Sequence, residues 1–406
     1  MERRVVITGL GIWSCLGTNL DEVRQSLYSG KSGIIFSQAR KDAGFRSALC
    51  ADVPKADLKK YLSRDLRKLM PEEAQYGYLA TIQALEHAKL DQDFLDQNEV
   101  GVIYGNDSVA EATMQALDKF RQAGSTAACG SGAIFQSMNS TVTMNLATLL
   151  HLRGINLTAS AACASGSHSV GLGYLLIKDG LQDCIICGGA QEANMFSVAS
   201  FDGLMAFSTR EDEPTKASRP FDRDRDGLVP GGGAATLVLE SYEHAVKRGA
   251  PILAEIVAWG FSGNGDHIST PNVAGPTRSL ELCLKNGGIN PRDIGYINAH
   301  ATSTHAGDGR EALAIANIFG DYRVPVTSTK SQTGHEMWMA GASELIYSIL
   351  MMKNDFIGGS LNFENPDEDT ACINVIPETR EAHFDMFLSN SFGFGGTNSS
   401  LIIKNL

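Results

Sequence analysis

The sequence predicts an α/β fold in which two similar halves form one body. Short apolar runs that end in glycine or polar residues alternate with segments of helical periodicity, and forty-two glycines fit the tight turns of such a fold. The order of elements that begins at residues 5–9 begins again at residues 252–260, with no proline-rich linker between the copies. This repeat predicts a pseudo-symmetric molecule with an N-terminal half over residues 1–250 and a C-terminal half over residues 251–406.

The first half begins with a strand at residues 5–8, which we expect to end at Gly9-Leu10-Gly11. Apolar runs bounded by glycine or polar residues predict further buried strands at residues 100–104, 156–159, 183–188 and 234–240. Apolar residues at helical spacing predict helices at residues 21–32, 72–89 and 140–152. Residues 209–226 are rich in Asp, Arg and Pro, which is typical of a long loop that carries function or covers a site.

The second half is expected to repeat this order. Strands are predicted at residues 252–260, 294–299, 384–390 and 400–404. A helix is predicted at residues 279–287, and residues 330–350 form a polar elbow followed by a long helix. Polar loops that follow buried strands in both halves can then meet in one crevice, as in other open α/β sheets.

Composition argues against several classes of protein. A formal net charge of −12 argues against general nucleic-acid binding, and no apolar run approaches the roughly 18–20 residues that span a bilayer. We therefore expect neither nucleic-acid nor membrane partners. Eight unclustered cysteines indicate reduced thiols, so we expect a cytoplasmic protein. Cys184 and Cys187 form a C-x-x-C pattern, but a strand would direct them to opposite faces, which disfavours a metal or redox site.

The most informative stretch is residues 156–177, where a short strand breaks into a helix at Cys163. The sulfur would lie near the helix N-terminus, where unpaired N–H groups and the helix dipole favour a thiolate. Small residues on both sides leave room for a substrate, and a helix so poor in charge should be buried, with the thiol at the bottom of a pocket. The alternative is that Cys163 is a small core residue, as cysteines often are.

Two histidines of the second half lie in loops rich in Gly, Ser and Thr. His300 follows a predicted strand, and His335 ends the polar elbow that begins at Lys330. A Gly-Phe-Gly-Gly loop around Phe394 follows another strand. A single histidine is ordinarily a satisfied surface or core residue, but a cysteine flanked by imidazoles is the arrangement that covalent catalysis by a thiol requires.

With these motifs in this order, the chain resembles the elongating β-ketoacyl-acyl-carrier-protein synthases, the condensing enzymes of fatty-acid synthesis. The resemblance covers nearly the whole chain, from residues 5–9 to the Asn-Ser-Phe-Gly-Phe-Gly-Gly-Thr-Asn stretch at residues 390–398. It implies a thiolase-like fold with duplicated halves in a five-layer αβαβα arrangement. It also implies a homodimer, with a heterodimer of two ketosynthases as the alternative.

The resemblance assigns roles to individual residues. The implied catalytic set is Cys163, His300, His335, Lys330, Glu344 and Phe394. Cys163 would accept the acyl group, the histidines would act as a pair, and Lys330 would pair with Glu344 and orient the region of His335. Phe394 would be a gate whose N–H joins that of Cys163 as an oxyanion hole. The implied substrate-binding set is Thr302, Thr304, Phe392 and Asn398, of which the two threonines would contact the phosphopantetheine arm.

Further residues match supporting positions of the family. Asp308 and Glu311 match acidic positions that support the site. Arg64 and Lys68 match basic positions that receive the acidic acyl carrier protein. Without the resemblance, the basic stretch over residues 55–70 is typical of a solvated helix face.

The implied enzyme is an acyltransferase that works in two steps. An acyl group passes from acyl carrier protein to Cys163, and a decarboxylative Claisen condensation with malonyl carrier protein then extends the chain by two carbons. No metal or other cofactor is implied, because both substrates are carried on the phosphopantetheine of the acyl carrier protein.

The chain departs from the family after the second histidine. The usual Gly-His-Ser-x-Gly-Ala-Ala-Gly is replaced here by a stretch in which Glu336, Trp338 and Met339 stand where serine, glycine and alanine are usual. A tryptophan in place of glycine costs roughly 1–3 kcal/mol unless the neighbours shrink. Either the core of an ordinary fatty-acid enzyme has compensated, or the acyl pocket is reshaped for a specialised polyene or polyketide-like chain.

Two other functions compete with this interpretation. The chain could be a non-condensing partner like the chain-length factors of ketosynthase heterodimers, but those lack the nucleophile that Cys163 supplies. It could be a thiolase that acts on coenzyme A thioesters. Thiolases carry a second catalytic cysteine near the C-terminal glycine loop, where this chain has Phe392 and Phe394.

Overall fold

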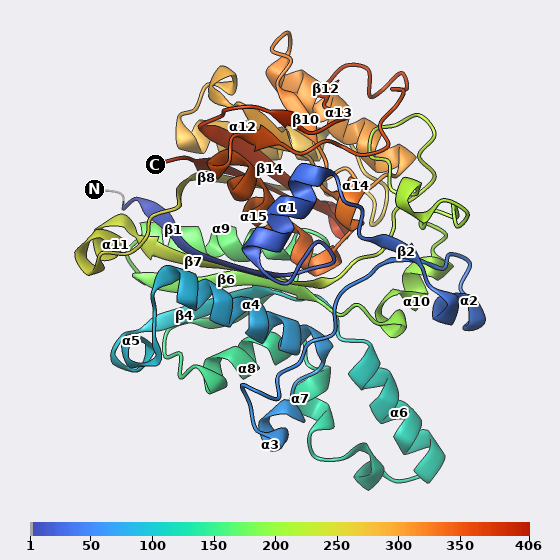
Figure 1. Ribbon diagram of the computed structural model, residues 1–406, viewed down its shortest axis with the longest axis vertical. Helices are drawn as coiled ribbons and strands as arrows, with labels where there is room; N and C mark the ends of the chain where they lie inside the picture. Colours follow the sequence, from blue (N-terminus) through green and yellow to red (C-terminus); the bar gives the residue numbers. More distant parts are fainter. Residues whose placement is uncertain (1–2) are drawn as a thin grey trace.

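The computed structural model describes residues 3–406 and has the α/β fold that the sequence predicts. Its main sheet has the strand order β12-β10-β9-β14-β15-β8-β1-β7-β6-β4-β5 (Figure 1). These strands are β1 (Val5–Trp13), β4 (Val100–Gly105), β5 (Asn156–Ala159), β6 (Cys184–Gln191), β7 (Gly233–Ser241), β8 (Ala254–Gly263), β9 (Tyr296–Asn298), β10 (Pro325–Thr327), β12 (Asn374–Val375), β14 (Met386–Gly393) and β15 (Thr397–Lys404). β1 pairs antiparallel with β7 and with β8, so this strand joins the strands of both halves into one sheet.

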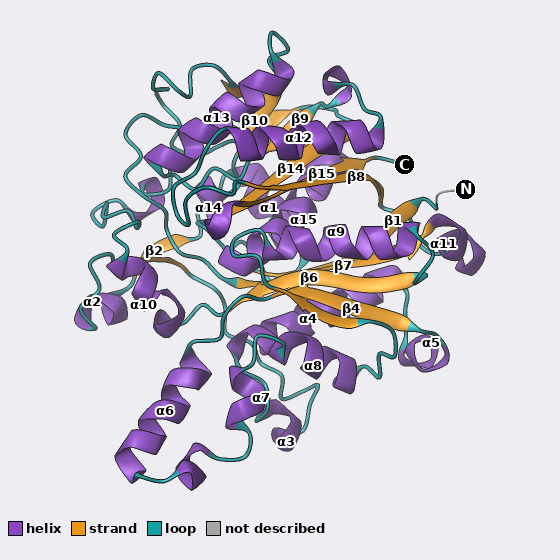
Figure 2. Ribbon diagram, turned by 180° about the vertical axis from the view of Figure 1, so that it is seen from behind, coloured by secondary structure: helices purple, strands orange, loops and turns teal. Residues whose placement is uncertain are grey.

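Helices and strands are stacked in five layers (Figure 2). α4 (Glu72–Ala88) and α8 (Thr141–Leu149) cover the outer face of the N-terminal strands. α12 (Ala274–Gly287) and α13 (His305–Phe319) cover the outer face of the C-terminal strands. α9 (Ser165–Lys178) and α15 (Ala340–Lys353) lie between the two parts of the sheet, which gives the expected αβαβα order.

The remaining elements are short or lie at the periphery. The other helices are α1 (Leu20–Ser29), α2 (Gln38–Asp42), α3 (Arg64–Arg67), α5 (Gln92–Gln97), α6 (Glu111–Ala123), α7 (Ala133–Ser137), α10 (Met195–Gly203), α11 (Tyr242–Arg248) and α14 (Lys330–Thr333). Two small sheets pair β2 (Ile34–Phe36) with β3 (Leu49–Ala51), and β11 (Phe356–Ile357) with β13 (Arg380–Glu381). Single 3-10 turns are η1 (Thr126–Cys129), η2 (Pro214–Lys216), η3 (Pro291–Asp293), η4 (Met337–Met339) and η5 (Phe394–Gly396).

The first strand is longer than the sequence predicts. β1 does not end at Gly9-Leu10-Gly11 but continues to Trp13. A Cβ atom on Gly9 or Gly11 would collide with carbonyl oxygens of α4, those of Ala84 and Ala80 respectively. The two glycines therefore let the helix lie directly on the strand, and they do not terminate it.

The central helices approach each other through glycines at their first turns. A Cβ atom on Gly166 of α9 would lie 2.9 Å from the nitrogen of Ala342, and one on Gly341 of α15 would lie 2.6 Å from the Cβ of Ser167. The backbones of the two helices lie so close at these glycines that no side chain fits between them. It brings the N-terminal ends of α9, from the first half, and α15, from the second half, to the same place in the molecule.

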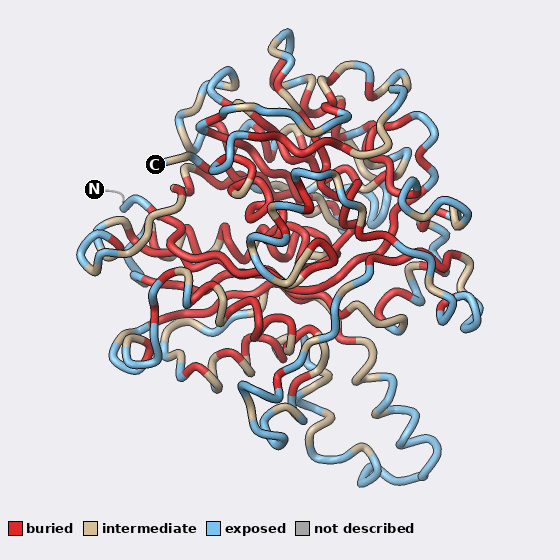
Figure 3. Tube along the Cα trace, viewed as in Figure 1, coloured by how far each residue is buried: buried red, intermediate tan, exposed pale blue. Residues whose placement is uncertain are grey.

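Burial separates a solid interior from one exposed projection. The sheet and the central helices are buried, whereas α6, η1 and α7 extend away from the body and are largely exposed (Figure 3). Cys184 and Cys187 are both buried and belong to different apolar cores, which confirms that they point to opposite faces of β6. None of the described helices is long and apolar enough to cross a membrane.

The packing of β4 against the start of α9 generates a stability prediction. A Cβ atom on Gly105 would lie 2.5 Å from the nitrogen of Gly166 and from the carbonyl carbon of Ser165. We expect Gly105→Ala to lower the free energy of unfolding by about 1–3 kcal/mol, measured by urea denaturation. Gly203→Ala is the matched control, because no heavy atom lies within 4 Å of the added Cβ there. Equal effects of the two substitutions would contradict the close packing.

Candidate active site

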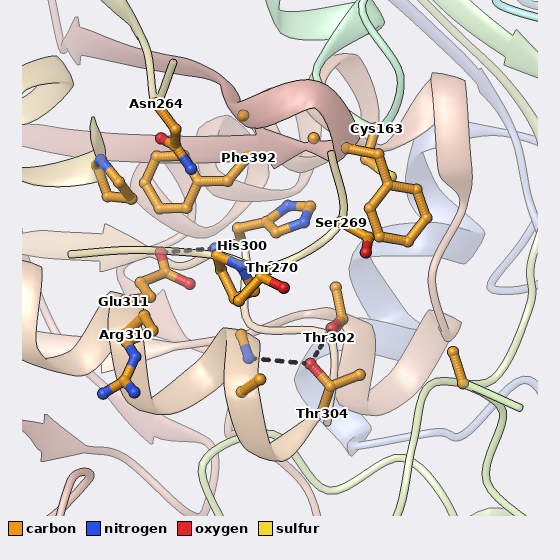
Figure 4. A pocket seen from close by; sticks show the side chains of 18 of the residues that line it. Cys163, Asn264, Ser269, Thr270, His300, Thr302, Thr304, Arg310, Glu311 and Phe392 are labelled. Atoms are coloured by element: carbon orange, nitrogen blue, oxygen red, sulfur yellow. Dashed lines mark hydrogen bonds between the residues drawn. The ribbon is translucent and has the colours of Figure 1, made fainter. Parts of the chain in front are cut away.

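A cavity of about 300 Å³ lies where the two halves meet, and both halves line it (Figure 4). Most of the residues singled out from the sequence face this one space. The structure brings together Cys163, His300, His335, Thr302, Thr304, Phe392, Phe394 and Asn398. Arg64 and Lys68 do not line the cavity and are exposed in and after α3.

Cys163 lies at a sharp turn between β5 and α9. The strand ends at Ala159, the helix begins at Ser165, and Ala162 adopts the left-handed conformation with φ +46°. Such a conformation costs of order 1–3 kcal/mol in a residue other than glycine and persists only where the surroundings hold it. The Ser165 hydroxyl holds this turn, because it accepts the N–H of Ala161 at 2.9 Å and donates to the Ala162 carbonyl at 2.6 Å.

The environment of the Cys163 sulfur differs in one respect from the expectation. Burial raises the pKa of the Cys163 thiol to about 12, and this effect outweighs the charge of Lys330 and the backbone N–H groups of Cys163 and Phe394, all of which lower the pKa. The N–H groups near the helix start favour the thiolate, as expected, but desolvation of the charged form is the larger effect and raises the pKa overall. The backbone N–H groups of Cys163 and Phe394 thus both act on the sulfur, although they come from different halves of the chain.

His300 follows β9 and is held from two sides. Its backbone N–H donates to the Glu311 carboxylate at 2.9 Å, and its ring Nδ1 lies 3.5 Å from the Nζ of Lys330. Because an ammonium group can only donate, Nδ1 is the acceptor and the proton of the neutral ring is on Nε2. Burial and the nearby charge of Lys330 lower the pKa of His300 well below its usual value, so the ring is neutral.

His335 has the same tautomer for a different reason. The backbone N–H of Met337 donates to its Nδ1 at 3.2 Å, which leaves the proton on Nε2. Nε2 is buried and has no hydrogen-bond partner among the described residues. Burial also lowers the pKa of His335 well below its usual value. The two rings are perpendicular, with centroids 5.4 Å apart, so the cavity contains two neutral imidazoles that each carry an Nε2–H.

A buried ion pair stands behind the histidines. Lys330 at the start of α14 contacts Glu344 of α15, and both side chains are 1% exposed. The expected pairing of Lys330 with Glu344 is therefore present. The ammonium group also contacts the ring of His300, however, whereas the expectation assigned it to the region of His335. Removal of one partner from such a pair costs about 3–5 kcal/mol, because a charge is left buried without compensation.

Two buried carboxyl groups shape the loop after β9. Glu311 of α13 accepts the N–H groups of His300 and Ala301, and Asp308 accepts the N–H of Thr302 at 2.9 Å. Burial raises the pKa of Glu311 to about 7 and that of Asp308 to about 6. These contacts fix the path of the loop that carries His300 and the two threonines.

The stretch that departs from the family is fully buried. Met337 and Trp338 belong to an apolar cluster that also contains Cys163, Val198, Phe207 and Leu228. The Trp338 ring lies 6.2 Å from that of Phe201, which stacks in turn on Phe207 and Phe394. Tryptophan is accommodated here because it fills an aromatic cluster beside the nucleophile.

Sequence reasoning missed a second wall of the cavity. The segment over residues 264–272 lines the cavity on this side. Two hydrogen bonds connect it to the Gly-Phe-Gly-Gly loop and the strand that follows. The Gly395 N–H donates to the Ile268 carbonyl at 2.7 Å, and the Asn398 amide donates to the Asn264 side-chain oxygen at 2.8 Å. Phe201 of α10 and the exposed Arg310 of α13 also line the cavity. A signal was present in the polar, Gly- and Pro-containing composition of residues 262–276, which follows a strand as the histidine loops do.

The burial of Glu336 generates a prediction on pH. Its side chain is 2% exposed, and burial raises its pKa from 4.5 to about 8. An acid whose pKa is higher in the folded than in the unfolded state loses stability as pH rises between these two values. We therefore expect Glu336→Gln to gain stability over the wild type by up to about 1.4 kcal/mol per pH unit across this range, measured by urea denaturation.

The exposed Glu281→Gln is the control for the loss of one negative charge. A stability difference between Glu336→Gln and the wild type that stays constant across the range would contradict the burial of this carboxyl group.

Comparisons with known proteins agree with this geometry. Residues 2–245 match the family model of the β-ketoacyl synthase N-terminal domain, and residues 253–364 match that of the C-terminal domain. The chain is 41% identical to 3-oxoacyl-[acyl-carrier-protein] synthase 1 of Haemophilus influenzae over 99% of both chains. It is 39% identical to the Escherichia coli K12 protein of the same name, over 100% of this chain and 99% of that one.

Solved structures agree as well. A β-ketoacyl synthase from Burkholderia phymatum superposes with a TM-score of 0.96 at 37% identity, and the ishigamide ketosynthase/chain length factor with 0.91 at 30%, each over 100% of both chains. The thiolase-like fold is that of these structures. The chain therefore belongs to the β-ketoacyl synthase family.

Proposed function

We propose that this protein is an elongating β-ketoacyl-acyl-carrier-protein synthase. The observation that carries the proposal is the content of one cavity: a buried thiol faced by two backbone N–H groups, and two neutral imidazoles whose Nε2–H groups are available to a substrate. The names of the relatives, 3-oxoacyl-[acyl-carrier-protein] synthases, support the same reaction.

In the first step, the sulfur of Cys163 attacks the thioester carbonyl of an acyl carrier protein. The bond between the carbonyl carbon and the carrier sulfur breaks, and the proton of the Cys163 thiol leaves with the carrier thiol. The N–H groups of Cys163 and Phe394 hold the oxyanion that forms on the way. Removal of one such donor typically lowers the rate about 10²–10³-fold.

In the second step, malonyl carrier protein loses CO₂, and the electron pair of the broken bond forms an enolate on the thioester. The Nε2–H groups of His300 and His335 donate to the enolate oxygen. Neutral rings suit this role, because burial and the charge of Lys330 keep each imidazole uncharged. The contacts of Lys330 with Nδ1 of His300 and of the Met337 N–H with Nδ1 of His335 leave the proton of each ring on Nε2. The enolate carbon then attacks the carbonyl carbon of the acyl group, the bond from that carbon to the Cys163 sulfur breaks, and the thiolate that leaves takes up a proton from solvent.

Release of CO₂ drives this chemistry, so the reaction that we propose needs no metal and no redox group. The substrates are held through their pantetheine arms. The hydroxyls of Thr302 and Thr304 lie 3.1 Å apart on one wall of the cavity, and Phe392 and Asn398 line it from β14 and β15. These groups offer polar and apolar contacts to an amide-containing chain.

Phe394 is suited to a gate. Its side chain is 38% exposed at the cavity, its ring stacks on Phe201, and it is followed by Gly395 and Gly396, which both have positive φ. Glycines in such conformations allow a loop to change its path at low cost. Movement of Phe394 would open the way to the sulfur.

The carrier protein docks, in our proposal, on the basic residues near α3. Lys55, Lys59, Arg64, Arg67 and Lys68 line one surface groove. Only Lys68 among them has an ion-pair partner in the described structure, the exposed Asp65 at 3.0 Å. An otherwise acidic protein thus presents a local positive surface to an acidic partner, which accelerates and orients encounter.

We also propose a homodimer that forms at the free edge of β5. This edge strand is exposed at Leu157, and the projecting α6 and α7 expose large apolar side chains. These side chains are Met114, Leu117, Phe120, Ile134 and Phe135. An unpaired edge next to exposed apolar residues is typical of a surface that a second chain covers.

The competing functions have less support. A chain-length factor does not need a cysteine at the turn before α9. A thiolase needs a second thiol at the cavity, and among the described residues Cys163 is the only cysteine that lines it. Identity of 39–41% to the 3-oxoacyl-[acyl-carrier-protein] synthases, against 30% to the ishigamide ketosynthase/chain length factor, favours a condensing 3-oxoacyl synthase over a chain-length factor.

Removal of the nucleophile tests the proposed function. We expect Cys163→Ala to remain folded but to accept no acyl group from acyl carrier proteins of any chain length, as measured by intact mass. Cys372→Ala is the control, because this thiol does not line the cavity, and it should load normally. Undiminished condensation by Cys163→Ala would refute the proposal, and a wild-type protein that accepts only polyunsaturated acyl groups would favour the specialised pathway.

Charge reversal tests the docking surface. We expect the double variant Arg64→Glu/Lys68→Glu to raise the KM for acyl carrier protein by at least about 5–30-fold, because two exposed charge contacts of about 0.5–1 kcal/mol each are lost, and repulsion adds to this loss. The effect should shrink in high salt and disappear with an acyl-pantetheine substrate. Lys247→Glu/Lys285→Glu changes the net charge equally on other exposed residues, and an equal rise in KM there would argue against a local docking site.

A further inference from the structure

The orientation of His335 depends on an unusual piece of backbone. The N–H that holds its Nδ1 belongs to Met337, which has φ +48° although it is not glycine. A strained conformation of this kind persists only where the surroundings over-determine it. Whatever fixes this turn also fixes the ring that faces the cavity.

One side of the turn is fixed by the backbone. The His335 N–H donates to the carbonyl of Val229 at 2.7 Å, and the Gly231 N–H donates to the carbonyl of His335 at 2.7 Å. These bonds place His335 itself. They do not reach Met337, whose N–H must point at the ring. The N–H of Ala340 donates to the Met337 carbonyl, and the N–H of Met339 donates to the Glu336 carbonyl at 3.1 Å, but these are local bonds within residues 336–340.

The other side of the turn is fixed by the side chain of Glu336. One carboxyl oxygen accepts the hydroxyl of Ser343 at 2.5 Å, and the other accepts the hydroxyl of Tyr347 at 2.9 Å. Both partners are on α15, one helical turn apart, and their neighbour Glu344 forms the ion pair with Lys330. The carboxyl group thus bridges the turn after His335 to the helix that carries Glu344, the acidic partner in the ion pair behind the histidines.

An apolar side chain of similar size would fill the same space without the cost of desolvating a carboxyl group. A buried polar group that is fully hydrogen-bonded holds its neighbours in one arrangement. An apolar residue does not hold them in this way, because its contacts are not directional. We propose that Glu336 is a positioning residue for His335, which acts through Ser343 and Tyr347 to hold the left-handed turn whose N–H orients the imidazole. This inference deepens the proposed function and rests on it.

The test compares Glu336→Leu, which removes the hydrogen bonds, with Glu336→Gln, which keeps a hydrogen-bonding group of the same size. The two half-reactions are measured separately: acylation of Cys163 by acyl carrier protein through intact mass, and release of CO₂ from malonyl carrier protein. We expect Glu336→Leu to lower the CO₂ release rate about 10–100-fold, because small misplacements of a catalytic group have effects of this size. Acylation should change less than about threefold.

Glu336→Gln should keep both rates within about threefold of the wild type, since each hydroxyl partner can donate or accept. A folded Glu336→Leu that releases CO₂ at the wild-type rate, or that loses both half-reactions equally, would overturn the proposal. Should Glu336→Leu fail to fold, Ser343→Ala/Tyr347→Phe removes the same two bonds from the other side, and its CO₂ release must fall while acylation persists. A wild-type protein that performs neither half-reaction would instead refute the proposed function, and this inference with it.

Discussion

The contact between the first turns of α9 and α15 is the constraint on which the site depends. The nucleophile comes from the N-terminal half and both imidazoles come from the C-terminal half, so the cavity exists only because the two helices meet end to end. Gly166 and Gly341 make this approach, and neither has room for a side chain. The small residues around Cys163 thus serve the packing of the two halves as much as access for a substrate.

Burial then determines the protonation of almost every group in the site. It keeps Cys163 as a thiol and both histidines as neutral rings, and it leaves Lys330 and Glu344 as a compensated pair. In so dry an environment, hydrogen bonds from backbone N–H groups are stronger than in water. The site therefore does not store a charged nucleophile. It is arranged to stabilise charge when charge forms.

Much of the site could be predicted from the sequence, because the residues that form its local turns are also the residues that line the cavity. The strand-to-helix turn at Cys163 and the polar loops at His300 and His335 were visible because their small residues serve both the turn and the site. The end of β1 could not be predicted from the sequence. Gly9 and Gly11 resemble a turn, and only the structure shows that α4 lies directly on them. The resting state of the thiol also could not be predicted, because depth of burial is a tertiary quantity. The partners of Glu336 lie seven and eleven residues away on a helix whose rotation the sequence does not define.

The position of β8 between β1 and β15 has a consequence for how the chain could be rearranged. Val5 pairs with Ile256 and Lys404 pairs with Glu255, so the first and last strands flank one common neighbour and begin and end at the same edge of the molecule. Two strand spacings amount to about 10 Å, which a linker of a few residues can span. A circularly permuted gene that joins these ends, and opens the chain at the exposed Gly249 after α11, would encode the same arrangement of strands with its histidines translated before its nucleophile. The fold therefore does not require the two halves to follow each other in this order along the chain, whereas it does require the contact between them.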